Sequence, residues 1–536
     1  MTHYDVIVAG GGHNGLTCAA YLSRAGKRVL VLEQRDILGG FCTTEETVPE
    51  APGFRMSRFA AELSTGTIPP TVDAELDLAA EGLRWVHPDP FYAYLAPDGR
   101  SIGFWRDVRR TVEEIGRFSH RDAEAYARFN AIMTSLWETV APYMQSHPTR
   151  VRPGTLMTIL RAAARGRAHL GEANRMMFSS PGAVIEEWFE SDELRAAMAC
   201  YSVSALASLD APGSGIVMSL MAVKHRWGLR RPVGGAGAYT GALAASIRRH
   251  GGVVRNRAPV TAVTLRDGRA TGVRLESGEE LTADTVIATV DPWTLGTKWL
   301  PDGALPDRAY RQLRGMSVIG NNIALFKGDV AVRARPELVG GRTDELIGST
   351  MLLAPSIEYV RAATEQSSLG RLAPEVPMWV SAPSAYDRSM VPDGSTGEGL
   401  YLYLPSVPYR LTDTDWSQQA RPYLDHCLDE LTGYMPDLKD LVIGSTPTSP
   451  SDLESISRIH KGSAFHADPT LSQFGPWRPI PAMAGYRTPV PGLLHAGSGN
   501  HPMGTVNGWS GRSAAHELLR GERAARRPRL LGPPRR

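Results

Sequence analysis

The chain has 536 residues, of which 42% are hydrophobic and 21% charged, and its formal net charge is +2. This length suits two or three domains, and the balanced charge argues against a nucleic-acid partner. Four scattered cysteines, with no CxxC pair and no metal-ligand spacing, predict a reducing compartment without a disulfide framework or a metal site. No apolar run approaches the roughly 18 to 20 residues of a spanning helix, and no signal-peptide pattern is present. We therefore expect a cytoplasmic protein.

The first 33 residues predict a β-α-β unit. Residues 5–9 (DVIVA) and 28–32 (RVLVL) are apolar and β-branched, as strands buried on both faces require, and residues 16–25 between them have a helical pattern. The whole unit has the length of about 30 residues that such a crossover needs.

The loop between the first strand and its helix, GGGHNG, satisfies GxGxxG. Gly10 permits a tight turn, Gly12 lets the backbone approach a pyrophosphate, and Gly15 allows close packing of helix on strand. The start of the helix then offers N–H groups and positive partial charge to phosphates. This context predicts a dinucleotide site.

Glu33 ends the second strand, where a carboxylate accepts hydrogen bonds from the ribose hydroxyls and repels a 2′-phosphate. FAD or NAD is therefore favoured over NADP. Arg35 and the pair Gly39–Gly40 follow directly, which indicates that the backbone passes close to something bulky. We interpret that space as holding a flavin diphosphate or ring, and so favour FAD.

The region from about residue 76 to 226 has a mostly helical pattern, with helices expected at 106–116, 121–143, 153–167 and 191–208. The apolar stretch 213–223 is either buried core or the wall of a substrate channel. A glycine-rich turn and a helix follow at 232–252, and then strands at 253–256, 260–266, 272–276 and 285–289. Because GGAGAYTG at 234–241 breaks GxGxxG and follows no buried strand, we expect no second dinucleotide site but a turn packed against FAD.

Further strands are expected at 321–326, 378–382 and 400–405, and a helix at 416–435. Residues 493–519 predict a strand, a Gly/Asn/Pro-rich loop and a helix whose N-terminus, at about 505–507, is suited to negative charge on a reduced flavin. The basic end of the chain, 521–536, predicts a disordered tail, with weak attraction to an anionic membrane surface as the alternative.

The two strand-loop-helix units at opposite ends of the chain predict an α/β fold with a discontinuous cofactor domain and an inserted substrate domain. The expected FAD-binding domain comprises residues 1–75, 228–292 and 485–520, and the expected mixed α+β substrate domain comprises residues 76–227 and 293–484.

Four segments together resemble the phytoene desaturase-like flavoproteins of the amine oxidase superfamily, including the branch of pyridine nucleotide-disulphide oxidoreductase domain-containing proteins. They are DVIVAGGGHNGLTCAAYLSRAGKRVLVLEQRDILGG, RPVGGAGAYTGALAASIRRHGGVV, AFHADPTLSQFGPWRP and LLHAGSGNHPMGTVNGWSGRSAAHEL. The resemblance implies a Rossmann-like, GR2-type FAD domain, and it spans nearly the whole chain.

The resemblance also implies cofactor contacts for several residues. Val260 matches a position whose backbone contacts adenine, Gly497 and Ser498 would lie near the ribityl chain and diphosphate, and Met503, Gly504, Thr505 and Val506 would lie beside the isoalloxazine. Many relatives have an acidic residue where Ser498 stands, but a hydroxyl can also hydrogen-bond the ribityl chain.

The expected reaction is dehydrogenation (desaturation) of a hydrophobic small molecule, either carotenoid-like or a secondary metabolite, with oxygen, a quinone or another carrier accepting the electrons. Alternatives are an amine or alcohol oxidase, a flavin-dependent polyene isomerase, and a non-enzymatic binding protein of the Rab-escort type. His501 and His466 are the candidate bases, although each histidine can equally be a hydrogen-bond partner of backbone or cofactor.

Overall fold

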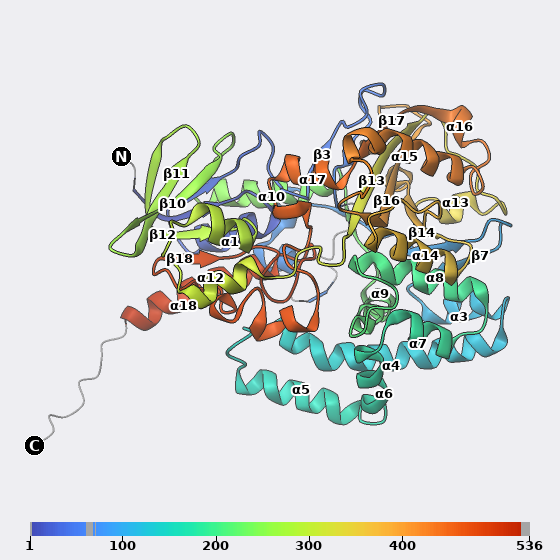
Figure 1. Ribbon diagram of the computed structural model, residues 1–536, viewed down its shortest axis with the longest axis horizontal. Helices are drawn as coiled ribbons and strands as arrows, with labels where there is room; N and C mark the ends of the chain where they lie inside the picture. The colour runs from blue at the N-terminus through green and yellow to red at the C-terminus, as the bar shows by residue number, and fades with distance from the viewer. Residues whose placement is uncertain (1–2, 61–67, 70, 527–536) are drawn as a thin grey trace, which may run out of the picture.

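The computed structural model describes residues 3–60, 68–69 and 71–526. Two seven-stranded sheets form its two halves (Figure 1). The half with the first sheet lies on the left in Figure 1, and the half with the second sheet lies on the right, above a group of helices.

The first sheet is built around β1 (His3–Ala9), which pairs in parallel with β2 (Val29–Leu32) and with β12 (Glu280–Ala288). On the outer sides, β9 (Val253–Arg255) extends the parallel pairing beyond β2, and β18 (Leu493–His495) extends it beyond β12. The sheet therefore joins strands from the beginning, the middle and the end of the chain. This arrangement confirms the predicted Rossmann-like domain of discontinuous segments.

Both faces of β1 are buried, as a parallel sheet requires. Val6 and Val8 belong to the hydrophobic cluster formed with α1 (His13–Arg24), α10 (Ala236–Arg249) and α18 (Trp509–Arg526). Ile7, which points to the opposite face, belongs to a second cluster.

That second cluster extends the first half beyond the predicted boundary at residue 292. Its members include Leu295, Leu300 and Leu313, in the segment that contains α11 (Pro292–Thr294) and α12 (Asp307–Arg314), beside the hairpin of β10 (Val260–Arg266) and β11 (Arg269–Leu275). These leucines link the segment after residue 292 to the first sheet, and the domain limits themselves stay a prediction.

The second sheet is mainly antiparallel, with one parallel pair between β6 and β14. Its strands in spatial order are β17 (Val442–Thr448), β13 (Ile323–Val332), β16 (Glu398–Pro408), β15 (Met378–Ser381), β14 (Thr350–Leu353), β6 (Tyr92–Leu95) and β7 (Ser101–Phe104). The sequence predicted β13, β15 and β16. It missed β14, and it placed β6 and β7 in a region expected to be mostly helical, because four-residue buried strands carry too little periodicity to be recognised. It also missed β17, a seven-residue, half-buried strand whose sequence VIGSTPT does not alternate clearly between apolar and polar residues.

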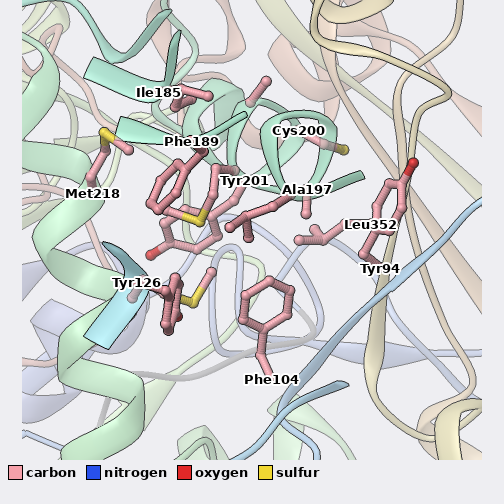
Figure 2. Close-up of a cluster of buried hydrophobic side chains, with 14 of the residues drawn as sticks. Tyr94, Phe104, Tyr126, Ile185, Phe189, Ala197, Cys200, Tyr201, Met218 and Leu352 are labelled. Atoms are coloured by element: carbon pink, nitrogen blue, oxygen red, sulfur yellow. The ribbon is translucent and has the colours of Figure 1, made fainter. Parts of the chain in front are cut away.

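Helices cover this sheet and build its largest core. They are α3 (Val108–Gly116), α4 (His120–Met144), α6 (Leu170–Phe178), α7 (Pro181–Trp188), α8 (Asp192–Ser202) and α9 (Ser219–Trp227). α5 (Pro153–Arg165) packs against α4 and contributes no side chain to this core. Figure 2 shows how Phe104 of β7, Tyr126 of α4 and Phe189 after α7 face one another in that core. In the apolar stretch 213–223, Met218 and Met221 are buried in the core, as one alternative predicted, while Leu220 and Val223 line a cavity.

α18 continues to Arg526, so residues 521–526 of the predicted tail are helical. Residues 527–536 lie outside the described part of the chain. Among the described residues, no helix is long and apolar enough to cross a membrane, and no group of His, Cys, Asp and Glu side chains could hold a metal ion. Cys18, Cys42, Cys200 and Cys427 are all buried free thiols.

Candidate functional site

A continuous cavity of about 680 Å³ lies where the two halves meet. Its wall includes Gly10 and Glu33, which follow the carboxyl ends of the parallel strands β1 and β2, and the loop that leads into α18. The second sheet contributes side chains from β6, β13, β14, β15 and β16. The position outside the carboxyl ends of parallel strands is where open α/β sheets bind their ligands.

The glycine loop has the geometry that its motif predicts. Gly10 has φ +118°, and a Cβ there would lie 2.2 Å from Oγ1 of Thr289. A Cβ on Gly15 would lie 2.1 Å from the carbonyl oxygen of Gly10, so helix and strand approach at backbone contact. A Cβ on Gly12 would meet no protein atom closer than 3.9 Å, which leaves the space beside this residue to a ligand.

Glu33 lines the cavity and is 6% exposed, and two backbone N–H groups hold its carboxylate. Gly11 donates its N–H to Oε2 at 2.9 Å, and Arg35 donates its N–H to Oε1 at 2.9 Å. Burial raises the pKa of Glu33, and the two N–H groups oppose that rise. Each oxygen keeps a lone pair, so the carboxylate can still accept a hydrogen bond from a ligand.

The two residues of the pair Gly39–Gly40 have different surroundings. Gly40 lines the cavity, and a Cβ there would lie 3.1 Å from Cα of Gly12. Gly39 does not line the cavity: its N–H donates to the carbonyl of Gly11 at 2.8 Å, and a Cβ would lie 2.3 Å from the carbonyl oxygen of Cys42. The bulky neighbour predicted for this pair is thus partly the first glycine loop itself.

Arg35 lines the cavity while its guanidinium donates to Glu45 at 2.8 Å. Val260 lines the cavity as well, as do the predicted residues of the C-terminal loop, Gly497, Ser498, Met503, Gly504, Thr505 and Val506. α18 begins at Trp509, slightly later than expected, because the side chain of Asn507 accepts the N–H of Trp509 at 2.9 Å and caps the helix. The turn at residues 234–241 does not belong to the described lining; Gly235 and Gly237 pack against Thr44 instead.

Several buried polar atoms on the cavity wall have no hydrogen-bond partner among the described residues. They are Nε2 of His13, Oδ1 of Asn14, Nη1 of Arg35, Oγ1 of Thr294 and Nδ1 of His466. Buried polar groups are nearly always hydrogen-bonded, so these donors and acceptors indicate a polar ligand. Together with the open space beside Gly12 and the free lone pairs of Glu33, they fit an adenine dinucleotide.

The two candidate bases occupy different environments. His466 lines the cavity, and burial lowers its pKa to about 4, opposed by the nearby carboxylate of Asp291. His501 is fully buried and is not among the described residues that line the cavity. Its Nε2 donates to the backbone carbonyl of Tyr143 at 3.2 Å, so the proposed base role does not suit it.

Arg478, which the sequence did not single out, holds the loops around the cavity. It is fully buried, burial lowers its pKa to about 10, and among the described residues its guanidinium meets carbonyl oxygens rather than carboxylates. The acceptors are the backbone carbonyls of Phe465, Ala467, Asp468, Gln473, Ser498 and Asn500 at 2.9–3.2 Å. Phe465 and Ser498 themselves line the cavity.

Aromatic side chains that the sequence did not assign form the other end of the cavity. Trp379 stacks on Tyr201 with centroids 5.9 Å apart and contacts Tyr92 and Tyr403 at 5.4 and 5.7 Å. Its Nε1 donates to the carbonyl of Cys200 at 2.9 Å, which fixes the indole. The alternation in YLYL at 401–404 was a usable signal, because its leucines lie in a core cluster and its tyrosines line the cavity.

Residues 15–519 match the family of flavin-containing amine oxidoreductases. Pyridine nucleotide-disulfide oxidoreductase domain-containing protein 2 of Rattus norvegicus is 30% identical over 96% of this chain and 93% of its own. A limonene dehydrogenase polypeptide of Castellaniella defragrans is 24% identical over 95% of this chain and 93% of its own. The lycopene-forming phytoene desaturase of Pseudescherichia vulneris is 24% identical over 94% of this chain and 96% of its own.

A solved structure of putrescine oxidase bound to putrescine superposes with a TM-score of 0.61, at 16% identity, over 98% of this chain and 100% of its own. At this identity the likeness shows the fold. The comparisons confirm the predicted resemblance and the α/β fold, and FAD is the cofactor.

Replacing Glu33 tests the ribose end of the site. We expect Glu33→Ala to weaken FAD binding about ten- to hundredfold, because hydrogen bonds to a charged group contribute about 1.5–3 kcal/mol. Titration of the apoprotein with FAD, followed by flavin fluorescence, measures the change. Glu279→Ala, which removes an exposed carboxylate of the same half, is the control, and equal affinities of the two variants would contradict the assignment.

Replacing Arg478 tests the loop anchor. Arg478→Met leaves several buried carbonyls without a donor, so we expect the free energy of unfolding to fall by at least about 3 kcal/mol. Arg478→Lys should lose less, because an ammonium provides three donors. Denaturant unfolding of the FAD-loaded protein gives these values. The matched control is Arg109→Met, at an exposed arginine, and a similar loss in both methionine variants would remove the anchoring role.

Proposed function

The chain belongs to the flavin-containing amine oxidoreductase family, and we propose that it dehydrogenates a neutral, hydrophobic small molecule by desaturation. The observation that carries this proposal is the aromatic end of the cavity, where the side chains from the second sheet are uncharged; the described wall also includes Lys224 of α9. The second sheet contributes to the wall the side chains of Tyr92, Leu325, Thr350, Trp379, Ser381, Tyr401 and Tyr403. The chain is an oxidoreductase enzyme, so a non-enzymatic binding protein of the Rab-escort type is set aside.

The distribution of charge favours a neutral substrate over an amine. Glu33 is the one carboxylate among the described residues of the cavity wall, and it lies at the end of β2 beside the glycine loop. An ammonium group at the aromatic end would therefore meet no described carboxylate. Cation–π contact with Trp379 or the tyrosines is the remaining way to hold an amine, and this keeps amine oxidation as the second candidate.

The size of the cavity favours a compact substrate. A volume of about 680 Å³ lies within the range of roughly 300–1,000 Å³ that holds one drug-sized ligand, and here FAD occupies part of it. The names of two relatives record limonene and phytoene as substrates. We infer that a molecule nearer the size of limonene, such as a secondary metabolite, suits this chain better than a carotenoid.

The cofactor contacts are proposed as follows. Glu33 accepts the ribose hydroxyls, the start of α1 and Gly12 approach the pyrophosphate, and Val260 borders the adenine. Gly497 and Ser498 border the ribityl chain, and Met503, Gly504, Thr505 and Val506 border the isoalloxazine. All of these residues line the cavity, and the orphaned polar atoms of His13 and Asn14 lie among them.

Bound FAD supplies a two-electron oxidant that accepts a hydride from a C–H bond. Desaturation also releases a proton from the neighbouring carbon, and His466 is our candidate for its acceptor. Because its pKa is lowered to about 4, the imidazole is neutral near pH 7, and its Nδ1 has no partner among the described residues. The aromatic side chains hold the substrate and exclude water from the reacting atoms.

Oxygen, a quinone or another carrier is proposed as the electron acceptor. A cytoplasmic location is part of the same proposal, and it is supported by four described cysteines that are all free thiols.

Anaerobic reduction of the flavin tests the proposed substrate class. We expect neutral cyclic hydrocarbons or alcohols to bleach the flavin, and amines with the same carbon skeleton to bleach it at least tenfold more slowly. Stopped-flow absorbance measures both rates. Faster bleaching by the amines would establish the amine oxidase alternative, and rearrangement of a polyene without bleaching would establish the isomerase alternative.

The pH dependence of the same reaction tests His466. The rate of flavin reduction should rise with pH through about 4 and then stay level towards neutral pH, because only the neutral imidazole accepts a proton. His466→Asn should lower the rate about 100-fold or more and remove this dependence, whereas His501→Asn should change the rate less than about threefold. A rate unaffected by His466→Asn, with weaker FAD binding, would make His466 a cofactor contact only.

A further inference from the structure

α5 presents an unusually apolar outer surface. Of its thirteen residues only Ala162 is buried, while Leu156, Met157 and Leu160 are 52%, 49% and 54% exposed. Spacings of three and four residues place these side chains on one side of the helix. Val151, just before the helix, is also exposed. Singly exposed apolar residues are ordinary in proteins, but a contiguous group indicates an interaction surface.

α6 follows α5 in the chain and lies with it at the lower edge of the molecule (Figure 1). Phe178, the last residue of α6, is 57% exposed, and its carbonyl accepts the N–H of Gly213 at 2.8 Å. Leu471, which is 38% exposed, lies against the same Gly213.

The charge around α5 has one sign. Residues 139–171 contain five arginines and no aspartate or glutamate, in a chain whose net charge is only +2. Arg150 is paired with the buried carboxylate of Glu517. Arg152, Arg161 and Arg165 are exposed and form no ion pair with a described residue.

We propose that α5 docks on the surface of a lipid bilayer that carries anionic headgroups. The apolar side chains enter the boundary between headgroups and acyl chains, and the arginines meet the lipid phosphates. The helix lies in the plane of the interface, since no described helix can cross a membrane. Pairing with the same surface of a second copy is disfavoured, because it would bring the arginines of two helices together.

The docking surface and the cavity share one helix. α4 packs against α5, and its side chains Trp137 and Met144 line the cavity. A bilayer under α5 would therefore lie next to the helix that forms part of the cavity wall. The docking surface itself rests on exposure and charge alone, so it stands whether or not the proposed reaction does.

Vesicle co-sedimentation of the full-length, FAD-loaded protein tests this proposal. Wild type should bind vesicles of phosphatidylcholine with phosphatidylglycerol at least tenfold more tightly than vesicles of phosphatidylcholine alone. A variant with Leu156→Ser, Met157→Ser and Leu160→Ser should lose at least tenfold in binding while retaining its flavin spectrum. Leu369→Ser, at an exposed leucine outside the α5 surface, is the matched control and should bind as wild type does.

A second variant addresses the basic C-terminus, with Arg527, Arg529, Arg535 and Arg536 replaced by Gln. If the C-terminal variant loses vesicle binding and the α5 variant retains it, the basic C-terminus and not α5 binds the vesicles, and the proposal is overturned. Wild type that binds neither kind of vesicle would also overturn it. If such a wild type forms a dimer in sedimentation velocity and the α5 variant is monomeric, α5 is a contact between copies of the chain.

Discussion

The contact between α1 and α18 is the constraint on which the site depends, because it brings the two ends of the chain to one cavity. A Cβ on Gly511 would lie 2.0 Å from the carbonyl oxygen of Asn14, so α18 packs on α1 at backbone contact. Ser510 donates to the carbonyl of Gly497 at 2.9 Å, and this fixes the terminal loop relative to its helix. The glycine loop and the terminal loop can bind one FAD only while this contact holds them opposite each other.

Part of the cavity wall consists of loops without regular secondary structure. Arg478 donates hydrogen bonds to backbone carbonyls of these loops, as the N–H groups of a helix or sheet otherwise would. Segments around residues 465–473 and 498–500 bury carbonyl groups, which need donors. A guanidinium offers five N–H groups in one plane, and with a pKa of about 10 Arg478 keeps its charge at neutral pH. The cost of burying that charge is offset by the carbonyl dipoles of the two loops, which the guanidinium connects to each other.

The parts of the fold that the sequence revealed are those determined by neighbouring residues. The strand-turn-helix at residues 3–24 and Glu33 could be assigned because the backbone geometry of a phosphate loop demands glycine at fixed spacing. The residues of the terminal loop were assigned from the family resemblance. Arg478, Trp379 and the strand β6 escaped prediction, because their roles depend on partners far along the chain. His501 illustrates the same limit, since its proximity to Met503 in sequence gave no sign that its ring turns to Tyr143 and away from the cavity.

The two ends of the cavity favour chemically different ligands. At one end a buried carboxylate and free N–H groups suit a ligand with hydroxyls and phosphates, and a purely apolar molecule would leave those groups unpaired at a cost of about 1–3 kcal/mol each. At the other end Trp379 and its tyrosines offer large apolar faces whose own polar atoms are partly satisfied by backbone. An apolar molecule would therefore be favoured at the aromatic end. α4, which packs against α5, lines the same cavity through Trp137 and Met144, and these two side chains pack with the core of the first half. α4 is thus the element that physically connects the wall of the cavity to the exposed apolar surface of α5.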